Sequence, residues 1–133
     1  MLFVYLMEEH PQYASRVAQI HRAMEKRGDQ LFTSVFTLGE VLTGALKEGA
    51  EELAAQIKRT ISPPRVTLLP FATAAAERFA RIRAAQRVSP ADAIHLACAA
   101  EAGVDLFLTN DRRLSGLVIP GIGFVAGLDV GLF

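Results

Sequence analysis

The sequence predicts an α/β protein, a three-layer α/β/α sandwich around a mainly parallel sheet. Short apolar stretches rich in β-branched and aromatic residues alternate with longer stretches in which apolar residues recur at helical spacing. The short stretches show no regular polar alternation, which is typical of strands buried on both faces. With 133 residues, 51% of them hydrophobic, the chain is long enough to bury one core. We therefore expect a single domain over residues 1–133.

Five stretches predict helices. In the first, apolar residues from Tyr13 to Met24 follow helical spacing, and Gly28 comes after the last turn. Pro63 and Pro64 follow the third, and Gly103 follows the fifth. The expected helices cover residues 12–27, 37–47, 51–61, 73–85 and 90–102. Between and after them, strands are expected at residues 31–35, 66–69, 105–109 and 123–125.

Charge and cysteine content narrow the function classes. Fourteen basic and fourteen acidic residues cancel, so the net charge does not indicate a nucleic-acid-binding protein. The single cysteine, Cys98, excludes an intramolecular disulfide and favours a reducing compartment. The apolar residues 1–7 lack the basic lead-in of a signal peptide and are too few to span a membrane. We expect a cytoplasmic protein with no membrane segment.

Three carboxylates are expected to meet where the strands end. Glu40 lies in the helix that follows the strand ending near Ser34, and Asp111 follows the strand that ends at Thr109. Asp92 begins a helix that runs antiparallel to the latter strand over about the same length, which places it at the same edge of the sheet. Carboxylates in one site repel each other unless a cation neutralises them. In the absence of soft ligands, Mg²⁺ or Mn²⁺ is the expected cofactor, and it can activate water against a phosphodiester.

Each acid also has a structural explanation. Thr37 and Glu40 have the spacing of a capping box, which stabilises a helix start without any ligand. Ser89 and Pro90 form a second helix start, in which Asp92 complements the helix dipole. Capping alone would account for two of the three acids.

Several neighbouring polar residues are candidate supporting residues of the site. Ser34 and Thr109 could orient a carboxylate or a water molecule, and they could equally satisfy backbone groups. Asn110 and Asp111 are also an ordinary turn pair. His95, one helical turn after the second acid, is either a metal ligand or a histidine packed between helix and sheet with one ring nitrogen bonded nearby.

Three motifs in this order resemble those of the PIN-domain family, especially the VapC-type toxins of bacterial toxin–antitoxin pairs. The resemblance covers nearly the whole chain, and the ordered set is more specific than any single motif. The motifs are Thr33-Ser34-Val35-Phe36-Thr37-Leu38-Gly39-Glu40-Val41, Ser89-Pro90-Ala91-Asp92-Ala93-Ile94-His95-Leu96-Ala97 and Leu108-Thr109-Asn110-Asp111-Arg112-Arg113-Leu114.

The resemblance implies a metal-dependent endoribonuclease with a cluster of four acids around Mg²⁺ or Mn²⁺. Glu40, Asp92 and Asp111 correspond to the second, third and fourth acids, and Thr109 to the hydroxyl residue beside the last. The implied reaction is hydrolysis of an RNA phosphodiester by metal-activated water. The implied partners are the RNA substrate, a second copy of the chain in a homodimer, and an antitoxin protein that often inserts a basic side chain at the acidic site.

A basic segment is the candidate RNA-binding surface. Between Lys58 and Arg87, seven Lys and Arg residues stand against one acid, Glu77. Such a segment can contact phosphates, and it can equally be a solvated helix surface. The RNA-binding candidates are Arg83, Arg87 and Arg112.

The start of the chain departs from the family pattern. PIN domains begin with an apolar strand that ends in an aspartate, and a helix follows closely. Residues 1–9 resemble that helix, and no acid occurs before Glu8. We therefore expect the domain to be N-terminally incomplete, without its central first strand and first acid. Alternatively, residues 2–6 are themselves a strand, because periodicity cannot decide over so short a run.

The leading functional hypothesis is a VapC-like endoribonuclease toxin. The missing first acid keeps a second hypothesis open, a catalytically silent PIN-like module that binds an antitoxin or RNA. A third is a different α/β enzyme, such as a phosphatase with a carboxylate nucleophile. Such an enzyme usually needs an acid directly after its first strand, which this chain also lacks.

Overall fold

The computed structural model describes residues 1–6 and 13–133, and the described part forms five strands and five helices. The strands are β1 (Phe3–Leu6), β2 (Gln30–Ser34), β3 (Thr67–Leu69), β4 (Leu106–Thr109) and β5 (Phe124–Gly127). The helices are α1 (Ala14–Arg27), α2 (Val35–Lys47), α3 (Glu51–Thr60), α4 (Thr73–Ala85) and α5 (Pro90–Ala102). The expected alternation of strands and helices is confirmed.

The five strands form one sheet in the order β3-β2-β1-β4-β5, and all four neighbouring pairs are parallel. The chain moves outward from β1 through β2 to β3, then crosses to the other side of β1 to form β4 and β5. In an open parallel sheet, such a reversal of direction opens a crevice at the carboxyl ends of the strands. The fold class predicted from the sequence is therefore confirmed.

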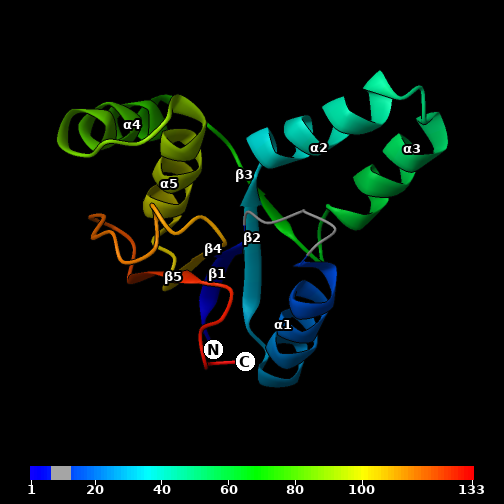
Figure 1. Cartoon of the computed structure of the whole chain (residues 1–133), viewed down its shortest axis with the longest axis horizontal. Helices are drawn as coiled ribbons and strands as arrows, with labels where there is room; N and C mark the ends of the chain where they lie inside the picture. Colours follow the sequence, from blue (N-terminus) through cyan, green and yellow to red (C-terminus); the bar gives the residue numbers. More distant parts are fainter. Residues whose placement is uncertain (7–12) are drawn as a thin grey trace.

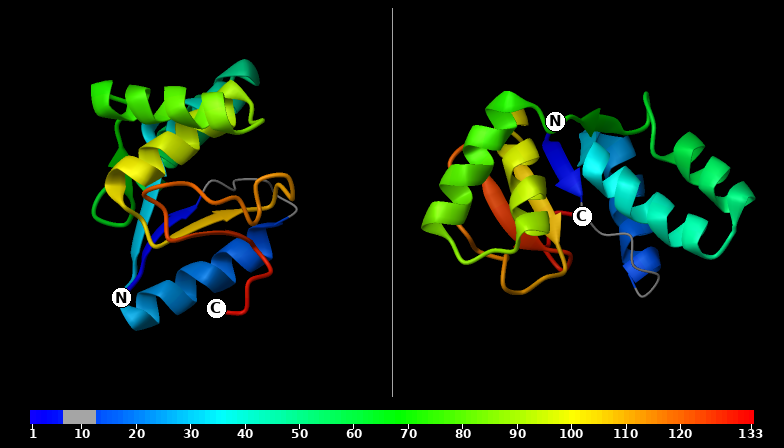
Figure 2. Two further views of the ribbon diagram at one scale, coloured as in Figure 1. Left: turned by 90° about the vertical axis from the view of Figure 1, so that its left-hand side faces the viewer. Right: turned by 90° about the horizontal axis from the view of Figure 1, so that it is seen from above.

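Helices cover the sheet on both faces, as the two views in Figure 2 and the ribbon in Figure 1 show. α4 and α5 lie over one face and α1 lies over the other. α2 and α3 pack against each other and extend to one side of this body. α5 packs against α4 and also contacts α2, β2 and β3.

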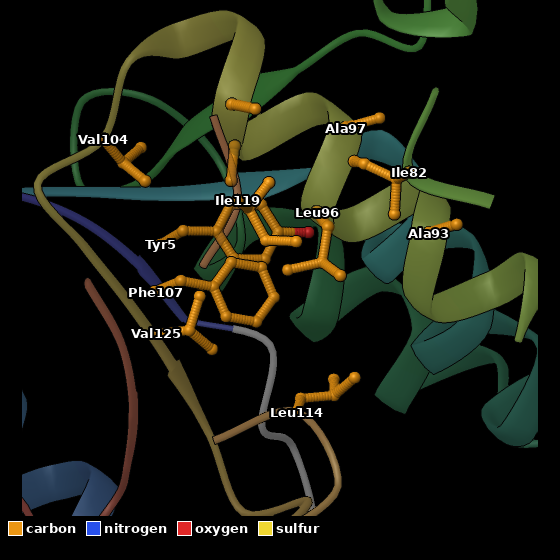
Figure 3. Packing of buried hydrophobic residues seen from close by; sticks show 12 residues of the cluster. Tyr5, Ile82, Ala93, Leu96, Ala97, Val104, Phe107, Leu114, Ile119 and Val125 are labelled. Atoms are coloured by element: carbon orange, nitrogen blue, oxygen red, sulfur yellow. The ribbon is translucent and has the colours of Figure 1, made fainter. Parts of the chain in front are cut away.

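Alternate residues of the central strands fill two separate cores. Tyr5 and Phe107 point toward α5, where their rings stack with centroids 4.8 Å apart beside Leu96 (Figure 3). Val4 and Leu108 point the other way and pack with residues of α1. Because both faces are buried, these strands need apolar residues at every position.

The start of the chain corrects one prediction from the sequence. Phe3–Leu6 is the central strand β1, not the helix expected over residues 1–9, and the strand expected to be missing is present. Val4, Tyr5 and Leu6 are at most 4% exposed, and ladders to β2 and β4 pair the strand on both sides. The run is too short for periodicity to distinguish a helix from a strand, and these long-range contacts make it a strand. The residues that directly follow β1, including Glu8, lie outside the described residues, so the expected absence of the first acid stays a prediction.

The start of α2 corrects a second prediction. The helix begins at Val35 and its N-cap is Ser34, whose hydroxyl accepts the N–H of Thr37 at 3.1 Å. Thr37 and Glu40 are therefore not a capping box, because both lie inside the helix. A serine directly at the strand end caps the helix without any connecting loop. Glu40 consequently lies in the second turn of α2.

α5 forms as the sequence predicts. Ser89 is its N-cap, with its hydroxyl accepting the N–H of Asp92 at 3.1 Å, and Pro90 occupies the first helical position. Gly103 ends the helix in the left-handed conformation, at a φ of 68° that favours glycine. In the described residues, no helix is both long enough and apolar enough to cross a membrane.

Candidate functional site

Glu40, Asp92 and Asp111 lie around the carboxyl ends of β2 and β4, and we call this region the acidic edge. Glu40 lies in α2, the helix that directly follows β2, and Asp111 comes two residues after β4. These strands flank β1, where the direction of the chain through the sheet reverses. Asp92 lies in the first turn of α5. The three acids therefore lie at the edge of the sheet that the sequence predicts. A crevice is expected at this same edge in an open parallel sheet.

Asp111 is held by the arginine two residues later. Its carboxylate accepts the backbone N–H of Arg113 at 2.9 Å and two guanidinium bonds, from Nε at 3.1 Å and from Nη2 at 2.7 Å. The Arg113 side chain is 83% exposed. Its hydrogen bonds lower the pKa of Asp111 below the ordinary value of a carboxyl group, against a smaller opposing effect of burial. Asp111 therefore carries its charge at neutral pH.

Asp92, in α5, interacts with the same arginine through its charge. The hydrogen bond and the charge of Asp111 are the main causes of the raised pKa of Arg113, and the charge of Asp92 makes a smaller contribution. The charge of Arg113 thus interacts with two of the three acids. Arginine at this position was not a candidate in the sequence, although an Asp followed two residues later by Arg in a turn is a local signal for such a pair.

Glu40 has a different partner. Its Oε1 lies 3.0 Å from Nε2 of His95, which is one turn further along α5 than Asp92. The His95 side chain is 3% exposed, whereas that of Glu40 is 50% exposed. His95 is packed between helix and sheet with a ring nitrogen bonded nearby, as one of the two interpretations of the sequence expected.

The supporting residues satisfy backbone groups. Ser34 caps α2, and the hydroxyl of Thr109 accepts the N–H of Asp111 at 3.0 Å. Both residues are fully buried. Thr109 thereby fixes the turn that presents Asp111, which is the role of a positioned hydroxyl at a strand end.

A cavity of about 310 Å³ adjoins Asp111 at the ends of β4 and β5. Asn110 and Arg112, two of the sequence candidates, line it, and so does Asp129 from the segment after β5. Asp129 was missed in the sequence because it follows a short, glycine-rich stretch with no recognisable motif. The other two arginine candidates lie elsewhere. Arg83, in the last turn of α4, and Arg87, in the connection to α5, are exposed, and Arg83 donates to the carbonyl of Val88.

The acidic edge fits a divalent cation by the type of its donors. Carboxylate oxygens are the ligands that Mg²⁺ and Mn²⁺ prefer. The side chains are not gathered around one point, however. Among residues 1–6 and 13–133, no group of three or more His, Cys, Asp or Glu side chains is close enough to hold a metal ion. The positive charge beside Asp111 is instead the guanidinium group of Arg113.

Solved structures similar to this chain are complexes of toxin–antitoxin systems. The DNA-bound VapBC of Salmonella typhimurium is 23% identical, with a TM-score of 0.70 over 96% of this chain and 99% of that one. VapBC2 of Rickettsia felis, bound to a promoter DNA fragment, is 14% identical, with a TM-score of 0.66 over 94% and 98%. VapBC-5 of Mycobacterium tuberculosis, a member of the VapBC family, is 25% identical, with a TM-score of 0.52 over 74% and 81%. A comparison with curated proteins finds no match.

The first two likenesses show a common fold over nearly the whole chain. The family model described as PIN domain matches residues 2–118. This match includes β1, all three motif acids and His95. The chain therefore belongs to the PIN domain family.

Proposed function

We propose that this protein is a metal-dependent endoribonuclease and the toxin component of a toxin–antitoxin pair. The observation that carries the proposal is the PIN family match together with the location of its three motif acids at one edge of the sheet. The family motifs assign Glu40, Asp92 and Asp111 as catalytic residues and metal ligands. Solved structures similar to the chain, described as VapBC complexes, support the toxin–antitoxin role.

The residues of the acidic edge have separate tasks in this proposal. Glu40, Asp92 and Asp111 supply negative charge and oxygen ligands, while Thr109 holds the turn of Asp111 in place. A bound Mg²⁺ or Mn²⁺ would supply an activated water molecule and stabilise charge on the phosphodiester. Arg112, at the adjoining cavity, is available to a phosphate of the RNA, as are Arg83 and Arg87 on the outer surface.

The partners are proposed from the similar VapBC structures and from exposed residues of this chain. The antitoxin partner is inferred from the VapBC complexes. We propose a homodimer because proteins of the family that the motifs resemble commonly form one, and the exposed Val118 (82%) and Phe124 (75%), the latter in the edge strand β5, are candidate contact residues. Exposed large apolar side chains are frequent at protein contacts. We propose a cytoplasmic location, in keeping with the single thiol of Cys98.

One observation favours the alternative of a catalytically silent module. In the described part of the chain the acids do not form a ready-made ligand group, and Arg113 is bonded to Asp111. A protein fixed in this arrangement could still bind RNA or an antitoxin. Metal-dependent cleavage separates the two functions.

The experiment measures cleavage of RNA by the purified chain in Mg²⁺, in Mn²⁺ and in EDTA, with the variant Asp92→Asn. Asparagine keeps the shape and the backbone N–H bonded by Ser89, so the helix start is retained. We expect cleavage only with metal, and a loss of about a hundredfold or more in the variant. Glu77→Gln removes an exposed acid of the Arg81 pair on α4 and serves as the control. Cleavage that survives EDTA, or an Asp92→Asn variant as active as this control, rules out the proposal. A folded chain that binds RNA without cleaving it supports the silent module.

A further inference from the structure

A buried histidine connects the core of the domain to an exposed acid of the acidic edge. His95 belongs to the buried face of α5, yet its Nε2 lies 3.0 Å from the half-exposed carboxylate of Glu40. A glutamate side chain in solvent samples many orientations, and fixing it costs conformational entropy. A bond to a rigid partner reduces that cost before any ligand arrives.

The other ring nitrogen of His95 is surrounded by hydroxyl groups. Nδ1 lies 2.6 Å from the hydroxyl of Tyr5 in β1. The hydroxyls of Ser34 and Thr37, at the start of α2, are each 3.3 Å away. The Tyr5 contact is the shortest of these three and has the distance of a strong hydrogen bond.

These partners determine which nitrogen carries the proton. An ionised carboxylate only accepts hydrogen bonds, so the Glu40 contact requires a proton on Nε2 of His95. In the neutral ring, Nδ1 then accepts, and the hydroxyl of Tyr5 is the donor that it needs. Burial raises the pKa of Tyr5 to about 12, so the phenol keeps its proton at neutral pH.

Aromatic neighbours hold the ring in place. The ring of Phe36 lies 5.3 Å from that of His95, at 55°, and the ring of Tyr5 lies 6.0 Å away, at 61°. Tyr5 is itself stacked on Phe107 in the core (Figure 3). A histidine that only had to satisfy its own polar groups would need no partner outside the core. Here the second nitrogen is aimed outward at an acid of the candidate site.

We propose that His95 is a positioning residue: the Tyr5 hydroxyl is hydrogen-bonded to its Nδ1, and its Nε2–H holds Glu40 in the orientation in which the acidic edge binds a divalent cation. The cation-binding part rests on the proposed function, whereas the hydrogen-bond arrangement does not. His95 is thus a fourth residue of the acidic edge, and it acts through one of the three motif acids, Glu40.

The first test is the tautomer of His95, measured in the full chain by long-range ¹H–¹⁵N NMR at neutral pH. We expect a proton on Nε2, which the hydrogen bond to Glu40 requires. His95→Gln, which lacks the ring, assigns the signals. A ring with its proton on Nδ1 and none on Nε2 overturns the proposal.

The second test is Mn²⁺ affinity, measured by calorimetry in the wild type and two variants. His95→Leu keeps an apolar side chain but loses the donor, and we expect a 10- to 100-fold weaker affinity, as for other groups that orient ligands. His95→Gln can donate an amide N–H from nearly the position of Nε2, and we expect its affinity to be within about threefold of the wild type. A folded His95→Leu protein that binds Mn²⁺ as the wild type does overturns the positioning role. Should that variant fail to fold, a His95→Gln protein as weak as Asp92→Asn overturns it.

The two tests separate this inference from the proposed function. A wild-type chain that binds no Mn²⁺ contradicts the metal-dependent function. It also contradicts the cation-binding role of the Glu40 carboxylate that His95 holds. The tautomer measurement then still shows whether His95 holds Glu40. Normal Mn²⁺ binding with the wrong tautomer contradicts the inference alone.

Discussion

Arg113 places a positive charge beside the Asp111 carboxylate, where a divalent cation would otherwise bind. Its guanidinium group lies on the Asp111 carboxylate, and its charge also interacts with Asp92. A cation of the chain thus partly neutralises the carboxylates that a divalent ion would neutralise. The pair is largely exposed on the arginine side, so its free energy is small and the arginine can be displaced.

The variant Arg113→Gln is expected to bind Mn²⁺ about two- to fivefold more tightly than the wild type, because the weak competition of an exposed ion pair with Asp111 is removed. Calorimetric titration at fixed ionic strength measures the change. Arg81→Gln, which removes the same charge from a pair on α4, is the matched control and should leave the affinity unchanged. Weaker binding in Arg113→Gln alone would mean that the arginine helps to form the site instead of competing for it.

The residues just before strand β5 lie in close contact with those just before its neighbour β4. The N–H of Gly123, just before the strand, donates to the carbonyl of Val104, and a Cβ at Gly123 would overlap the carbonyl oxygen of Asp105. Gly44 in the middle of α2 is different, because a Cβ there meets nothing within 4 Å. The two glycines therefore have opposite expected responses to the same substitution.

Gly123→Ala is expected to lower the free energy of unfolding by about 1–3 kcal/mol, since the backbones of two adjacent segments must move apart. Gly44→Ala is expected to raise it by about 0.5–1 kcal/mol, because alanine loses less backbone entropy inside a helix. Urea unfolding of both variants and the wild type measures the changes. A Gly123→Ala protein as stable as the wild type would show that β5 does not pack against β4 in the way described, and a Gly44→Ala protein less stable than the wild type would contradict the open space at that position of α2.

The elements most accurately predicted from the sequence are those with local signals. α4 and α5 have the predicted bounds, because helical periodicity, Ser89, Pro90 and Gly103 all mark the same boundaries. The start of α2 was placed two residues late, since Ser34 and Thr37 both have side chains that can cap a helix. β1 was the largest error, because its four residues become a strand only through pairing with β2 and β4.

The candidate site was predictable to a similar extent. The strand ends and the direction of α5 place Glu40, Asp92 and Asp111 at one edge, and the motif pattern singled out the same residues. The bonds of Arg113 and of Tyr5 with the site depend on side-chain orientation and on β1, neither of which the sequence pattern determines. His95 was predicted as a buried residue, but not as the partner of an acid.

On the scale of the whole molecule, the sheet order β3-β2-β1-β4-β5 is what brings the site together. Glu40 and Asp111 follow strands on opposite sides of β1, and α5 returns across the sheet to add Asp92. No pair of these acids is closer than 19 residues in the sequence, as their numbers show. The central claim is that this topology makes one divalent-cation site from three distant acids.

The most direct test of that claim is paramagnetic broadening of backbone amide signals by Mn²⁺ in the full chain, with Mg²⁺ as the diamagnetic control. The account predicts saturable broadening that is strongest for the amides around Glu40, Asp92 and Asp111 together, and that Asp92→Asn weakens at all three. Broadening centred elsewhere, or confined to one of these acids, would contradict a shared site, as would the absence of any saturable effect.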